Sequence, residues 1–99
     1  MIEILFYLKH KHSPENCPAL RGPEIVAKTF GKIITPEHAK KAGVKVLGMY
    51  ADAPAHTVGF IIEADNIDRI GAFLGPLLSI GSVETTPVSD LAKTKLIFA

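Results

Sequence analysis

The fold is decided by the stretch VKVLGMYADAPAHTVGFIIEA, residues 44–64. Two apolar segments rich in valine, isoleucine and aromatic residues, 44–50 and 56–64, flank the short sequence ADAPA. Such segments favour β-strands, and a proline among small residues favours a turn. The stretch therefore predicts a β-hairpin with a short loop.

The register of this hairpin follows from its apolar pattern. A three-residue loop sets Val46 opposite Ile62 and Tyr50 opposite Val58, which gathers apolar side chains on one face. A slip by one residue would put Lys45 on that face. We therefore expect Tyr50 and Asp52 to share a face with His56.

The remaining segments form a regular alternation around the hairpin. An apolar strand precedes a loop, and the loop precedes a helix that starts at a proline, is interrupted by TPEH and stops at a glycine. A second helix with an Asp or Asn cap follows the hairpin and ends or kinks at a proline, and a last strand ends on a sheet edge. In chain order the landmarks are strand 2–9, loop 10–22, Pro23, Thr35, Gly43, Asp65 or Asn66, Pro76 and strand 81–88.

This β-α-β-β-α-β order predicts an α+β fold of the ferredoxin-like type. Its sheet has four antiparallel strands, with 2–9 and 56–64 adjacent at the centre and both helices on one face. The opposite face would carry Leu5, Tyr7 and Ile61, whose exposure to water is unfavourable. We expect a second copy of the sheet to cover it, giving a homodimer.

Composition limits the classes of function. The 99 residues suffice for one domain, 1–99, and 47% of them are hydrophobic, which also favours an oligomer. The net charge is +1 without a block of like charge, and no apolar run is long enough to cross a bilayer, so neither a nucleic acid nor a membrane is expected as a partner. A single cysteine suits a reducing compartment, and we expect a cytoplasmic protein. The apolar tail, 89–99, is expected to pack on the partner subunit or on a sheet edge.

The sequence HKHSPENCPAL, residues 10–20, contains three candidate metal-ligating side chains. His10 continues the alternation of the first strand, which places it on the helix side of the sheet, near His56 at the start of the neighbouring strand. His12 and Cys17 follow in the loop at that end. Imidazole and thiolate are ligands for zinc, copper or nickel, so these four residues are the predicted metal ligands.

Other polar residues have smaller expected roles. Glu15 and Asp52 are lesser candidate ligands, whereas His38, at the far end of the first helix, is expected to be an exposed surface residue. If the site is catalytic instead, His10 or His56 would act as a general base and Tyr50 as a hydrogen-bond donor.

The sequence AGVKVLGMYADAPAHTVGFIIEAD, followed by PLLSIGSVETTPV, resembles the dimeric α+β barrel superfamily. That superfamily includes antibiotic-biosynthesis monooxygenases and muconolactone-isomerase-like proteins, and the chain is also similar to a family of small proteins of unknown function within it. The resemblance implies a homodimer in which two sheets pack face to face. The tryptophan and asparagine pair common in the monooxygenases is not recognisable, and the chain has no tryptophan.

Three functions remain open at this stage. The first is a dimeric binding protein that holds a metal ion or small ligand at the mouth formed by His10, His12, Cys17 and His56. The second, which the resemblance permits, is a cofactor-independent isomerase or monooxygenase. The third is a regulatory or scaffolding dimer without catalytic activity. The convergence of imidazoles and a thiol favours the first.

Overall fold

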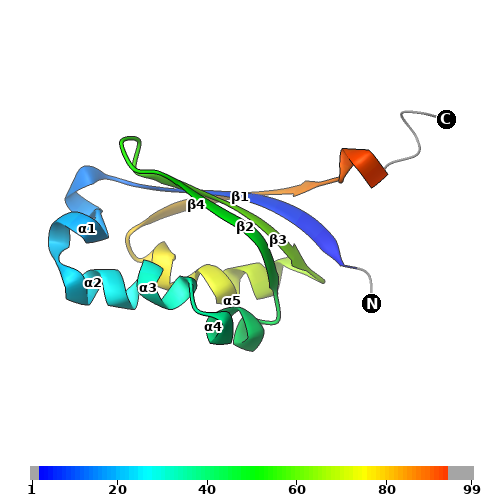
Figure 1. Ribbon diagram of the computed structural model, residues 1–99, viewed down its shortest axis with the longest axis horizontal. Helices are drawn as coiled ribbons and strands as arrows, with labels where there is room; N and C mark the ends of the chain where they lie inside the picture. The colour runs from blue at the N-terminus through cyan, green and yellow to red at the C-terminus, as the bar shows by residue number, and fades with distance from the viewer. Residues whose placement is uncertain (1–2, 94–99) are drawn as a thin grey trace.

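The computed structural model describes residues 3–93 as an α+β fold in two layers, with one sheet above a layer of helices (Figure 1). The sheet has four antiparallel strands in the order β2-β3-β1-β4. The central strands are therefore β1 and β3, as the sequence predicts, and the arrangement is ferredoxin-like. The strands span Ile4–His12 (β1), Lys45–Asp52 (β2), Thr57–Ala64 (β3) and Gly81–Val88 (β4).

The helical layer is more divided than the sequence suggests. The expected loop 10–22 contains two short turns, and the expected first helix is broken at Thr29, whose hydroxyl donates to the Ile25 carbonyl at 2.7 Å. Hydroxyl bonds of this kind compete with the helical ladder. The bounds are Pro14–Asn16 (η1), Pro18–Arg21 (α1), Pro23–Lys28 (α2), Phe30–Ile33 (α3), Pro36–Ala42 (α4), Ile67–Leu78 (α5) and Leu91–Lys93 (η2).

Local sequence signals explain most helix ends. The Thr35 hydroxyl accepts from the amide of His38 at the start of α4, and Gly43 adopts the left-handed conformation after its end. The Asn66 side chain caps α5 by accepting from the Arg69 amide. Of the two alternatives predicted for Pro76, an end or a kink, the end is wrong, because α5 continues to Leu78.

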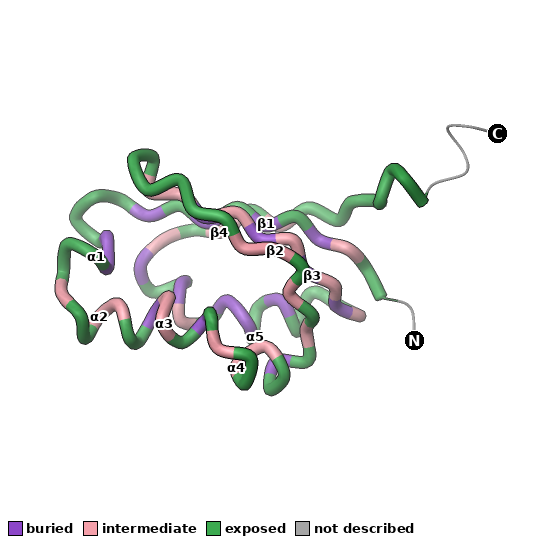
Figure 2. Tube along the Cα trace, viewed as in Figure 1, coloured by how far each residue is buried: buried purple, intermediate pink, exposed green. Residues whose placement is uncertain are grey.

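The core lies between the sheet and the helices, where buried positions concentrate (Figure 2). Along β1 the burial alternates, so that Phe6, Leu8, His10 and His12 face the helices and are buried. The alternation therefore continues unchanged from apolar side chains into imidazoles. The largest core side chains come from β1, β3, α3 and α5: Leu8, Phe60, Ile62, Ile33, Ile70, Phe73 and Leu77.

The predicted hairpin register is wrong beyond Val46. Val46 does pair with Ile62, but Gly48 pairs with Ile61 and Tyr50 with Gly59, because a β-bulge occupies the intervening position. One extra residue in a strand turns every later side chain to the opposite face. The bulge brings Met49, rather than Gly48, against the core. Burial of the larger apolar side chain gives a physical reason for it.

Two further observations concern the tail and the length of the helices. The tail, which is expected to pack on a partner subunit or a sheet edge, begins with the short turn η2, and its apolar end, 94–99, lies outside the described residues. Within the described part of the chain, no helix is both long and apolar enough to span a membrane.

Candidate functional site

Three potential metal ligands meet at one end of the sheet. His12, Cys17 and His56 each offer one ligand atom, and these atoms lie within 4.8 Å of one another. His12 and Cys17 are buried, with 7% and 8% of their surface exposed, and His56 is half-buried. His12 and His56, the outermost members in the sequence, are 44 positions apart, so the fold rather than the local sequence assembles this cluster.

The backbone holds each member of the cluster in place. His12 ends β1, and its amide donates to the His56 carbonyl at 3.1 Å, which ties the strand end to the β2–β3 hairpin. Cys17 lies between η1 and α1, where its amide donates to the Pro14 carbonyl and its carbonyl accepts from the Leu20 amide. Both turns and the hairpin loop lie at the same end of the sheet (Figure 1).

His56 has an unusual backbone conformation. Its φ of 52° is the one positive value at a residue other than glycine within residues 3–93. Its amide closes the hairpin by donating to the Ala53 carbonyl at 3.1 Å. The left-handed region is costly for most side chains; Gly adopts it most readily, and Asn, Asp and His adopt it more often than other residues. The conformation places the imidazole next to His12, with ring centroids 5.4 Å apart.

His10 lies one step deeper than the cluster. It is fully buried, and its Nε2 lies 3.0 Å from Nδ1 of His12 in a hydrogen bond. Phe30 contacts both rings, with centroids 5.7 Å from His10 and 5.9 Å from His12. The sequence predicts His10 as a ligand beside His56. The structure instead puts His12 there, because β1 continues to His12 where the sequence suggests an end at Lys9.

The electrostatic environment keeps both imidazoles neutral. Burial and, to a smaller degree, the nearby His12 lower the pKa of His10 to about 4, against an opposing effect of the Ser82 backbone. Burial, and then the neighbouring His56, lower the pKa of His12 as well. A neutral imidazole is the form that binds metals. The cluster therefore presents at least one ligand in its binding form at neutral pH.

The other predicted residues do not join this cluster. Glu15 is exposed and is not part of the three-residue group. His38 is outside the cluster, as expected, but the prediction that it is exposed is wrong: it is half-buried, and its Nε2 lies 2.6 Å from the Phe73 carbonyl of α5. Its position on α4, which packs against α5, explains this contact.

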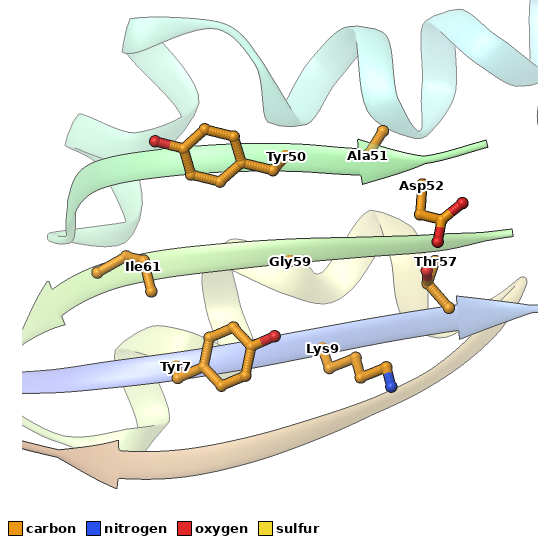
Figure 3. Close-up of a pocket in the computed structure, with 8 residues that line it drawn as sticks. All are labelled: Tyr7, Lys9, Tyr50, Ala51, Asp52, Thr57, Gly59 and Ile61. Carbon is orange, nitrogen blue, oxygen red and sulfur yellow. The ribbon is translucent and has the colours of Figure 1, made fainter. Parts of the chain in front are cut away.

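Tyr50 and Asp52 lie on the face of the sheet that carries no helices. The bulge sets them opposite Gly59 and Thr57, so their predicted place beside His56 on the helix side is wrong. Figure 3 shows both around a shallow cavity of about 410 Å³ on this open face, together with Tyr7 and Lys9. Tyr50 therefore lies on the opposite face of the sheet from His10 and His12.

Comparison of the chain with protein-family models, with curated proteins and with solved structures finds no match. The geometry of the His12, Cys17 and His56 cluster is therefore the observation that bears on function. No pattern in the sequence distinguishes His12 from His10 as its member, because both are histidines on the same face of one strand.

Proposed function

We propose that this protein binds a transition-metal ion through His12, Cys17 and His56. The observation that carries the proposal is that their ligand atoms lie within 4.8 Å of one another while two of the three residues are buried. Two imidazoles and a thiolate match the preferences of zinc and copper, and to a smaller degree nickel. A reducing compartment such as the cytoplasm would keep the Cys17 thiol available.

The geometry requires a small contraction on binding. Ligand atoms around a tetrahedral zinc lie about 3.5 Å apart, given metal–ligand bonds of about 2.0–2.3 Å. The separations between the ligand atoms therefore have to decrease by about 1.3 Å at most. His56 sits in a hairpin loop and can move more easily than the two buried ligands. Three protein ligands leave a fourth position for water or another small ligand, as at catalytic zinc sites.

Metal titration of untagged protein tests this proposal. Native mass spectrometry and calorimetry with Zn²⁺, Cu⁺ and Ni²⁺ should show one ion per chain for at least one metal. Replacing a ligand by Cys17→Ser or His56→Asn should weaken binding at least tenfold, and His38→Gln is the matched control because His38 is a histidine outside the cluster. Absence of one-to-one binding by the unchanged protein, or equal loss in the control, contradicts the proposal.

We also propose that the protein is a homodimer in which the open faces of two sheets pack together. Large apolar residues on this face support the interpretation, since Tyr7, Leu47 and Tyr50 are 44%, 48% and 70% exposed in the single chain. Burial of such side chains is favourable by about 25 cal/mol per Å². Light scattering at micromolar concentration should give twice the chain mass of 10.7 kDa. A monomer at that concentration would contradict the dimer while leaving the metal site untouched.

A further inference from the structure

His10 is the deepest polar side chain next to the cluster. None of its surface is exposed, and its Nε2 is hydrogen-bonded to Nδ1 of His12 at 3.0 Å. Its own Nδ1 has no partner with hydrogen-bond geometry in the described part of the chain. A buried polar group without a full partner costs free energy. The structure thus contains an imidazole whose presence the core does not explain.

The bond between the two histidines can be made in two ways. A neutral imidazole has one N–H and one lone pair, so one ring must donate and the other accept. If His10 donates, the hydrogen of His12 is on Nε2, and no nitrogen of His12 has a lone pair free for a metal. If His12 donates from Nδ1, its Nε2 keeps the lone pair, and the hydrogen of His10 lies on Nδ1.

We propose that His10 is a positioning residue of the metal site, which accepts the Nδ1–H of His12 and so presents Nε2 of His12 to the ion. The inference rests on the proposed metal binding. Metal-binding histidines commonly donate their other N–H to a second group, which fixes the ring orientation and makes the ligand more basic. That second group is usually a carboxylate or a carbonyl, and here a buried imidazole takes its place.

The surroundings of His10 limit the movement of its ring. Phe30 packs against both rings, His10 at 75° and His12 at 56° between ring planes, and so limits their rotation. Across the sheet, Val83 on β4 pairs with His10 and packs against the core. The ring is therefore held on several sides in the orientation that reaches His12.

Three variants test the role of His10. His10→Phe keeps a ring of similar size but removes the acceptor, and it should weaken metal binding about 10–100-fold. His10→Gln places an amide oxygen near the position of Nε2 and should restore most of that loss. Val83→Ala, which disturbs packing beside His10 without touching the hydrogen bond, should weaken binding less than His10→Phe. Wild-type affinity in folded His10→Phe, or equal losses in all three variants, would overturn the proposal.

Nitrogen-15 NMR of the metal-free protein gives a second readout that a purely structural role would not change. The unchanged protein should show His12 with its hydrogen on Nδ1, and His10→Phe should show a mixture of tautomers. An Nε2–H tautomer of His12 in the unchanged protein contradicts the inference. If the protein binds no metal but His12 shows the Nδ1–H tautomer, the proposed function fails while the direction of the hydrogen bond stands.

Discussion

The two faces of the sheet are made by the same strands but have opposite environments. Leu8 and Tyr7 are neighbours on β1, yet Leu8 is fully buried under the helices and Tyr7 is 44% exposed on the open face. The covered face continues from apolar side chains to His10 and His12 without a change in burial. The comparison shows that the helical layer, rather than side-chain polarity, determines what is buried here.

Two glycines, one on the open face and one at the histidine end, differ in the space beside them. On the open face Gly59 has space beside it, since a Cβ there would lie 3.7 Å from the Tyr7 ring. At the histidine end Gly81 has none, because a Cβ would meet the Lys11 carbonyl oxygen at 2.1 Å and the His10 ring at 3.0 Å. The second glycine is required by a close approach of two strands, and the first is not.

The largest difference between the faces should appear on truncation of the neighbouring pair on β1. Leu8→Ala should lower the free energy of unfolding by about 2–5 kcal/mol, because it leaves a cavity in a packed core. Tyr7→Ala should cost less than about 1 kcal/mol in a chain kept monomeric by dilution. Denaturant unfolding monitored by circular dichroism measures both.

Repeating the unfolding measurements on these two variants at several protein concentrations tests whether the open face forms a dimer interface. If a second sheet covers the open face, the cost of Tyr7→Ala should increase at concentrations where the unchanged protein is dimeric. A cost that does not depend on concentration, together with an unchanged molecular mass, would show that the open face is free in solution.

The next largest effect is the pH dependence of stability in the metal-free protein. The folded-state pKa of His10 is about 4, below the ordinary 6.5, so the unfolded chain binds more protons between these values. The contribution of neutral His10 is therefore fully present above about pH 6.5 and is lost as the pH falls toward 4, by about 2–3 kcal/mol. Urea unfolding from pH 7 to pH 4 measures it.

The variant His10→Phe is the control for this prediction. Its stability should fall less steeply over the same range, because His12, whose pKa burial also lowers, then titrates alone. Identical slopes for the two proteins would mean that His10 is not held neutral by the fold.

The smallest effects should come from the two glycines. Gly81→Ala should destabilise by about 1–3 kcal/mol through the contact with the Lys11 backbone, and it should also weaken metal binding by displacing His10. Gly59→Ala should change stability by less than about 1 kcal/mol and can even stabilise, because alanine is less flexible than glycine in the unfolded chain. Thermal melting of both variants checks the order, and a larger cost at Gly59 would contradict the comparison.

Much of the fold could be predicted from the sequence because its signals are local. The caps at Thr35 and Asn66 and the left-handed stop at Gly43 are each specified by one or two residues. The bulge before Gly48 could not be predicted in this way. The bulge depends on whether Met49 or Gly48 contacts the helices. The alternation of apolar and polar residues along the strand does not specify this tertiary contact.

The position of the His12, Cys17 and His56 cluster at one end of the sheet could be predicted, but which histidine of β1 belongs to it could not. The topology places the end of the first strand beside the start of the third, so histidines from both segments had to approach one another. Where β1 ends could not be read from KHKH, because polar residues give no sign of burial. Because β1 extends to His12, His12 is the residue that lies with Cys17 and His56, and His10 is buried behind it.

The left-handed backbone at His56 implies a conflict between thermal stability and metal binding. Asn or Gly would occupy a φ of 52° with less strain than most side chains, so His56→Gly and His56→Asn are candidates for a chain that melts later without metal. A laboratory selection for heat resistance alone would then tend to erase this imidazole. A selection that also requires metal binding would keep it. The residue recovered at position 56 would therefore show whether metal binding had been selected together with heat resistance.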